Sequence, residues 1–192
     1  MNPLNSVRGA ITTGVVIALI LMILIAPTGF QELGLARWLH ILSGVMWIGL
    51  LWYFNVVQIP ALGVAAADKG GPGGAGITKY VAPRALFWFR WSALATVVTG
   101  VLLAWMLGFL VQALTLAPSH RAIGIGVYLA LVMAFNVWFI IWPNQKKALG
   151  IVTVDAAEKA AAAKKAGMTS RINTMLSIPM LYCMAAQSHG GF

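Results

Sequence analysis

The chain has 192 residues, of which 60% are hydrophobic and only 9% are charged. Soluble domains carry about 25% charged residues, so this composition excludes a soluble globular protein. Disorder is excluded as well, because it requires low hydrophobicity. The long unbroken apolar runs lack the alternation of transmembrane strands and predict an all-α integral membrane protein. We assign the net charge of +9 to loops and lipid headgroups, and we expect no nucleic-acid partner.

The chain contains a single cysteine, Cys183. One cysteine forms no intrachain disulfide, no Cys-x-x-Cys-His attachment for c-type haem and no cysteine-ligated iron–sulfur cluster. Histidine is therefore the main protein ligand that the sequence offers to any cofactor.

We expect one membrane domain over residues 1–192, built as a bundle of about five transmembrane helices. The spans are expected at about residues 11–27, 35–59, 85–114, 123–142 and 170–188. Pro60 and Pro143 are read as the ends of the second and fourth spans, and Gly108 as a tilt or break in the third. Pro179 should kink the fifth span or free a carbonyl. The first span is read as an uncleaved anchor rather than a signal peptide, because the run is long and no small-x-small cleavage site follows it.

Two polar segments separate the spans. Residues 61–83 form a glycine-rich connector, which lacks the Gly-Lys-Ser/Thr ending of a phosphate-binding loop. Residues 155–166 form a short polar helix, with Asp155 and Glu158 at N-cap and N3 spacing and Gly167 as its stop. Both segments are expected on the cytoplasmic side.

Lysine and arginine set the expected orientation, because they gather in cytoplasmic segments. With the N-terminus inside, only Arg37 and Arg121 fall on the outer side, and Arg90 lies within the third span. The other 10 of the 13 basic residues are cytoplasmic: Arg8, Lys69, Lys79, Arg84, Lys146, Lys147, Lys159, Lys164, Lys165 and Arg171. The chain is therefore expected in the bacterial inner membrane as a multi-pass protein with a cytoplasmic N-terminus and a periplasmic C-terminus.

The second span carries a stripe at helical spacing that includes Arg37, His40, Gly44 and Trp47. An imidazole with a glycine one turn away suits a flat porphyrin, and Arg37 is placed to pair with haem propionates. His40 and His189 reach the same membrane depth in this topology, as axial ligands would. The alternative is that His40 is only a hydrogen-bonding residue and that Gly44 marks helix packing.

The other polar residues in the spans are explained by structural roles or leave two interpretations open. Arg90, in Phe87-Trp88-Phe89-Arg90-Trp91, is either a functional intramembrane charge or a structural anchor that snorkels to the interface. Asn136, Asn173 and Thr174 are read as contacts between helices. A metal-ion site is disfavoured, because the outer side offers few carboxylates.

Several strings resemble the membrane domain of the bacterial membrane-bound urate oxidases, also called urate hydroxylases. They are Arg37-Trp-Leu-His40-Ile-Leu-Ser-Gly44-Val-Met-Trp47, Phe89-Arg90-Trp91 with Thr99-Gly100, Asn136-Val-Trp-Phe-Ile-Ile-Trp142-Pro-Asn144-Gln145-Lys146, and Arg171-x-Asn173-Thr174 with Ser177-x-Pro179-Met180 before His189. The resemblance implies a helical redox domain that holds b-type haem, with His40 and His189 at the motif histidines. It also implies a short form, because the family's C-terminal cytochrome c has no counterpart here.

These observations predict a haem-b-binding electron-transfer protein or subunit of the inner membrane. We expect it to contact the lipid bilayer and either a periplasmic cytochrome c or a larger membrane complex. One alternative is a haem-free accessory subunit of a respiratory or photosynthetic complex. Another is a urate-type oxidase whose cytochrome c is supplied in trans.

Overall fold

The computed structural model describes residues 2–26 and 31–188, and within these ranges the chain is helical without strands. The long helices are α1 Val7–Ile25, α2 Glu32–Trp52, α4 Ala82–Met106, α6 Arg121–Phe135 and α8 Ala156–Ser188. Short α-helices follow three of them: α3 Ile59–Ala67, α5 Leu110–Leu114 and α7 Trp142–Ala148. The remaining elements are the 3-10 turns η1 Pro3–Asn5 and η4 Pro118–His120 and the π turns η2 Tyr53–Gln58, η3 Ile77–Val81 and η5 Asn136–Ile141.

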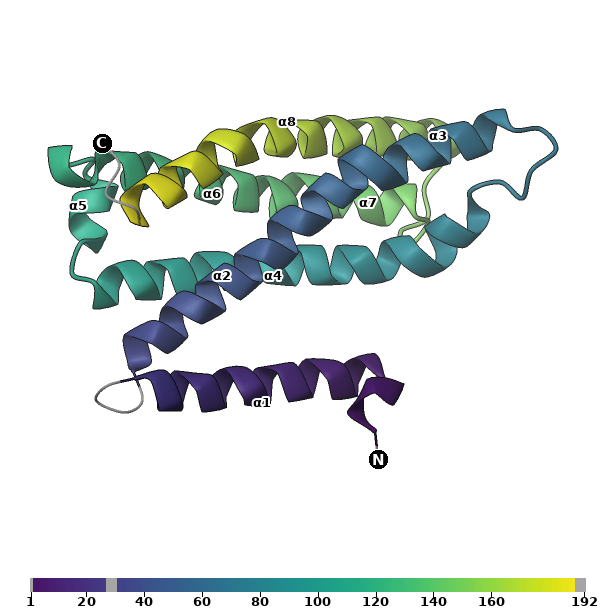
Figure 1. Cartoon of the computed structure of the whole chain (residues 1–192). Helices are drawn as coiled ribbons and strands as arrows, with labels where there is room; N and C mark the ends of the chain where they lie inside the picture. The colour runs from purple at the N-terminus through teal and green to yellow at the C-terminus, as the bar shows by residue number, and fades with distance from the viewer. Residues whose placement is uncertain (1, 27–30, 189–192) are drawn as a thin grey trace.

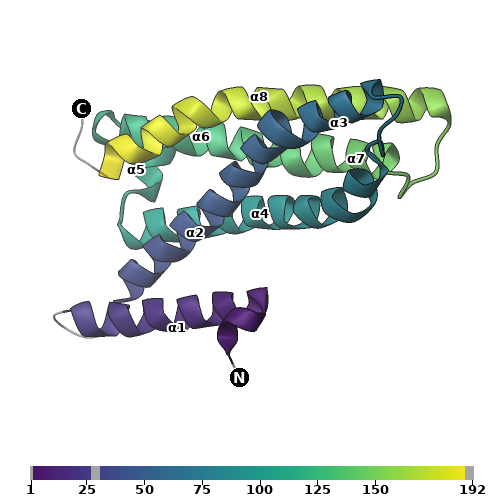
Figure 2. The same cartoon turned by 45° about the vertical axis from the view of Figure 1, so that its right-hand side comes forward.

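The helices form a bundle that α2 crosses obliquely (Figure 1). Helix α2 packs mainly on α4, whereas α6 and α7 pack along α8. Helix α1 lies to one side of this bundle in both views (Figures 1 and 2), and none of its residues is buried. The framework that positions inward-facing side chains is therefore α2, α4, α6 and α8.

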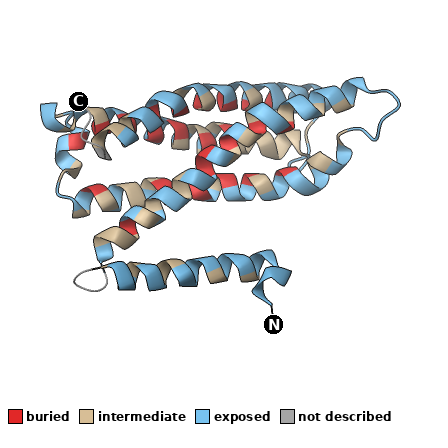
Figure 3. Ribbon diagram, viewed as in Figure 1, coloured by how far each residue is buried: buried red, intermediate tan, exposed pale blue. Residues whose placement is uncertain are grey.

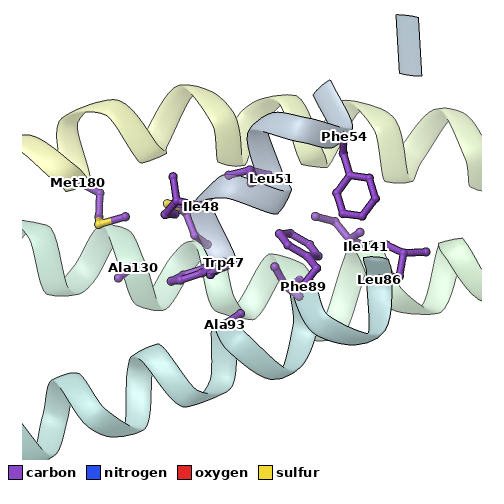
Figure 4. Packing of buried hydrophobic residues seen from close by; sticks show 12 residues of the cluster. Trp47, Ile48, Leu51, Phe54, Leu86, Phe89, Ala93, Ala130, Ile141 and Met180 are labelled. Atoms are coloured by element: carbon purple, nitrogen blue, oxygen red, sulfur yellow. The ribbon is translucent and has the colours of Figure 1, made fainter. Parts of the chain in front are cut away.

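The core lies where α2 crosses the other helices (Figure 4). Trp47 and Leu51 of α2 are fully buried, and Phe54 meets Phe89 of α4 edge-on at 5.5 Å between ring centroids. The rest of this cluster is apolar and comes from the four framework helices and η5: Ile48, Leu86, Ala93, Ala130, Met133, Val137, Ile141 and Met180. Burial of large apolar side chains at one crossing point holds α2 at its oblique angle.

Much of the outer surface is apolar. Buried residues lie on the inward sides of the bundle helices, while most outward-facing positions are exposed (Figure 3). Many of these are large hydrophobic residues, such as Val98 and Trp105 of α4 and Phe139 of η5. A water-soluble protein seldom exposes so much contiguous apolar surface, whereas a lipid-facing surface requires it.

Four helices are long and apolar enough to cross a membrane: Val7–Ile25, Glu32–Ala67, Ile77–Met106 and Pro118–Ala148. The all-helical membrane architecture is thus supported for the part of the chain that the structure describes. The expected fifth span, residues 170–188, forms the second half of α8 and is not among these four. The count of five spans and the orientation remain predictions.

Each of the three π turns ends two residues before a proline, at Pro60, Pro83 and Pro143. In the first, the Ile59 N–H donates to the Phe54 carbonyl five residues back. A proline in a regular α-helix lacks an N–H and its ring clashes with the carbonyl four residues back. The wider π turn shifts the carbonyl pairing by one residue, so that the helix accommodates the ring.

The prediction that Pro60 and Pro143 end the second and fourth spans is therefore wrong. The helices continue through them to Ala67 and Ala148. The expected connector over residues 61–83 is correspondingly shorter, because only residues 68–74 lie outside helix between α3 and the next helical segment.

The break expected near Gly108 is confirmed, and it ends the third span earlier than residue 114. Gly108 adopts φ +76°, and the Phe109 N–H donates to the Ala104 carbonyl, which closes the end of α4. Residues 110–114 form the separate helix α5, which packs on α6. Glycine allows this turn because it has no side chain to oppose a left-handed φ.

The prediction that Gly167 ends a short polar helix is also wrong. Asp155 caps the helix as expected, since its Oδ1 accepts from the Glu158 N–H at 2.7 Å. Gly167, however, does not adopt a positive φ, and the helix runs on to Ser188 with Pro179 inside it. The expected polar helix 155–166 and the expected span 170–188 are therefore one continuous helix.

Candidate functional site around His40

His40 is half-buried on α2 and lies against α4. Its Nδ1 is 3.0 Å from the Thr96 carbonyl oxygen and 3.3 Å from Thr99 Oγ1. A carbonyl oxygen only accepts, so this contact assigns the proton of the neutral imidazole to Nδ1. The lone pair is then on Nε2, which leaves that nitrogen available to a ligand.

Gly100 explains how the imidazole approaches α4 so closely. A Cβ at this position would lie 2.8 Å from His40 Cε1 and 3.2 Å from Nδ1, closer than packed atoms come. Thr99 Oγ1 donates to the Ala95 carbonyl at 2.6 Å, so its lone pairs face the ring. Thr96, Thr99 and Gly100 therefore form a cradle that fixes the position and the tautomer of His40.

The other residues of the α2 stripe are placed differently from one another. Gly44 faces α4, where a Cβ would make ordinary contact with Thr96 Cγ2 at 3.8 Å. Trp47 is fully buried in the core, and its Nε1 has no hydrogen-bond partner. Arg37 is exposed. The structure thus brings His40, Gly44 and Trp47 onto the face that packs on α4 and leaves Arg37 outside that contact.

Of the other two histidines, only His120 lies within the residues that the structure describes. His120 stacks on Phe109 at 5.1 Å between ring centroids, and its Nδ1 is 2.9 Å from Ser119 Oγ. His189 lies outside the described residues. Within residues 2–26 and 31–188, no group of three or more histidine, cysteine, aspartate or glutamate side chains is arranged to hold a metal ion.

Sequence reasoning identified His40 but did not assign Thr96, Thr99 and Gly100 to its surroundings. These residues follow it by 56 to 60 positions and belong to another helix. The available signal was their spacing, because two threonines and a glycine within five residues mark a small, polar patch on an otherwise apolar helix.

Polar side chains also join α8 to its neighbours. Asn136 Nδ2 donates to Asn173 Oδ1 at 2.8 Å, which supports the reading of these two residues as a contact between helices. Two further contacts come from the α2 side: Trp52 Nε1 donates to Ser177 Oγ at 2.9 Å, and Asn55 Nδ2 to Ser170 Oγ at 2.8 Å. Thr174 instead donates to a carbonyl of its own helix.

The fold and these contacts define an all-helical membrane protein with a half-buried histidine held between two of its helices. Within this class, residues 104–191 match the family model described as "Urate oxidase N-terminal". The match covers slightly less than half of the chain and supports the resemblance over α5 to α8. It includes Asn136, Asn173 and His189 but not His40.

No curated protein and no solved structure matches the chain. The family match is therefore the relationship that bears on function. It indicates a membrane domain related to oxidases.

Proposed function

We propose that this chain is a haem-b-binding redox protein or subunit of the bacterial inner membrane, with His40 as an axial ligand. The observation that carries the proposal is the contact between His40 Nδ1 and the Thr96 carbonyl. Histidines that ligate a metal usually donate their other ring N–H to a carbonyl or carboxylate, which orients the ring and raises its basicity. His40 meets this requirement, because its Nδ1–H faces the Thr96 carbonyl and its Nε2 is left for the metal.

Haem, when bound, would supply one-electron transfer. The chain's own residues would orient the ligand: Thr96 holds the Nδ1 proton, Thr99 supports the same ring edge, and Gly100 gives the imidazole its space. Exposed Arg37, one turn before His40, remains the proposed partner of a haem propionate. His189 is proposed as the second axial ligand, and a periplasmic cytochrome c or a larger complex as the electron partner.

The sequence predicts Gly44 and Trp47 as cofactor-binding residues because they share the α2 stripe with His40. Because both pack toward α4 or the core, we propose that they support α2 rather than contact the porphyrin. Haem would then approach His40 from the Nε2 side of the ring. This arrangement reconciles a ligand role for His40 with helix packing on the same stripe.

The test is a reduced-minus-oxidised visible spectrum of protein purified in detergent after expression with ample haem supply. We expect a Soret shift and an α band of the b type. His40→Ala should abolish or grossly change these bands, whereas His120→Ala, the matched control, should leave them intact. A spectrum without haem bands would overturn the proposal and favour a haem-free accessory subunit, and an unchanged His40→Ala spectrum would exclude His40 as a ligand.

The family match favours a second candidate, a urate-type oxidase whose cytochrome c is supplied in trans. Membranes containing the protein should then reduce added cytochrome c in a urate-dependent manner. Failure to reduce it, with haem demonstrably bound, would count against this candidate and leave the electron-transfer proposal standing.

A further inference from the structure

Arg90 of α4 is a cation with no carboxylate beside it. Among the described residues the one ion pair joins Lys147 and Glu158 at 2.6 Å, and the whole chain has 4 acidic residues against 13 basic ones. Among the described residues, Arg90 makes one hydrogen bond, from Nη1 to the Leu86 carbonyl of its own helix at 3.4 Å. A guanidinium has five N–H donors, so most of its donor capacity is unused.

A second cation shares the aromatic ring that Arg90 covers. The Arg90 guanidinium carbon lies 3.9 Å from the centroid of the Trp142 ring, and Lys146 Nζ lies 5.8 Å from the same centroid. Phe87 flanks the guanidinium at 5.3 Å. The ring faces attract each cation, but the two like charges repel one another, and this repulsion is strongest where water is scarce.

The cluster lies toward the start of α4 and the end of α7. The Arg90 side chain turns back toward the N-terminal end of α4, as its contact with Leu86 one turn earlier records. Lys146 lies one turn after Trp142, near the end of α7. Arg90, Trp142 and Lys146 are all half-buried, so the cluster borders the surface where α4 begins and α7 ends.

We infer that Arg90 and Lys146, which both lie against the Trp142 ring, bind the phosphate of an anionic lipid headgroup. A phosphodiester accepts two parallel N–H bonds from a guanidinium, and an ammonium supplies a further point charge. Basic pockets between transmembrane helices recognise anionic headgroups in this way. Within the described part of the chain no carboxylate forms an ion pair with Arg90 or Lys146, whereas the surface of a bilayer presents phosphates.

The test compares thermal unfolding of the full chain in vesicles of phosphatidylcholine alone and in vesicles that also contain phosphatidylglycerol. We expect phosphatidylglycerol to raise the Tm of the wild type. Arg90→Gln and Lys146→Gln should lose most of this shift, and Arg90→Lys should retain part of it. Lys69→Gln, which removes an exposed charge from the 68–74 connector, should keep the full shift.

If Arg90→Gln fails to fold, Lys146→Gln still decides the question. A phosphatidylglycerol-dependent shift that survives in both variants overturns the inference, because the lipid would then act through the general charge of the protein. An equal shift on adding inorganic phosphate to phosphatidylcholine vesicles overturns the assignment to a lipid. A variant that loses stability equally in both vesicles would show that Arg90 is only a packing residue.

Discussion

Asn136 of η5 and Asn173 of α8 form a chain of two hydrogen bonds that joins these two elements. Asn136 Nδ2 donates to Asn173 Oδ1 at 2.8 Å, and Asn173 Nδ2 donates in turn to the Met133 carbonyl at 2.9 Å. Asn173 is fully buried. Met133 lies just before the π turn, where the change of hydrogen-bond pattern alters carbonyl pairing, so Asn173 secures α8 at that point.

Replacing Asn173 with alanine should therefore destabilise the bundle. Hydrogen bonds between membrane helices contribute about 0.6 to 2 kcal/mol each. The Asn173→Ala variant loses two, so we expect a loss of about 1 to 4 kcal/mol in the free energy of unfolding. Unfolding in mixed detergent micelles measures it. Asn144→Ala, which removes a bond within a single helix, is the control and should cost clearly less.

A methyl group at Gly100 should displace His40. The added Cβ would lie 2.8 Å from His40 Cε1, so the ring or the helices must move apart. We expect a destabilisation of about 1 to 3 kcal/mol, as for other overpacked sites. If haem is bound, its visible spectrum should change as well. Gly49→Ala is the matched control, because no atom lies within 4 Å of a Cβ there. Equal stability and spectra in both variants would contradict the cradle described around His40.

Gly124 should tolerate substitution even less. A Cβ at this position would collide with the backbone carbonyl of Ala113 and would lie 2.7 Å from Leu116 Cδ2. A backbone atom does not move aside as a side chain can, so Gly124→Ala should separate α5 from α6. We expect a lower Tm and a loss of about 1 to 3 kcal/mol or more. Retention of the wild-type Tm would show that α5 is not fixed against α6.

Asp155 caps the N-terminus of α8 in a polar part of the chain, and its contribution to stability is measurable. Asp155 accepts from the Glu158 N–H, and Glu158 forms an exposed ion pair with Lys147. Asp155→Ala should cost about 0.5 to 2 kcal/mol, as removal of other N-caps does. Glu158→Gln should cost less than about 1 kcal/mol, and less still at high salt. Thermal unfolding at two salt concentrations separates the two effects, and a strongly salt-dependent Asp155→Ala loss would argue against capping as its cause.

The candidate site illustrates how far sequence reasoning reaches. His40 stands out because polar residues are rare in apolar spans, and that rarity is visible in one dimension. Its partners Thr96 and Gly100 come from α4, and their contact with His40 depends on the angle at which α2 crosses α4. Local periodicity carries no information about that angle, because the packing of the whole core sets it.

The predicted helix ends show the same difference between local and tertiary information. The break at Gly108 was predictable because a positive φ is a local property of glycine. The passage of helices through Pro60 and Pro143 was not, because it depends on π turns that the surrounding packing keeps in place. Gly167 remained helical for a related reason, since neighbouring contacts along α8 outweigh a weak local preference.

The sequence by itself determined the helical membrane class, its apolar helices and the resemblance that the family match supports over residues 104–191. These follow from composition and short motifs, which do not depend on where other segments lie. Only the tertiary structure decided that His40 lies in a cradle on α4 and that Arg90 shares the Trp142 ring with Lys146. The contacts of His40 with Thr96 and of Arg90 with Trp142 join residues more than fifty positions apart, so they arise only once the helices have packed against one another.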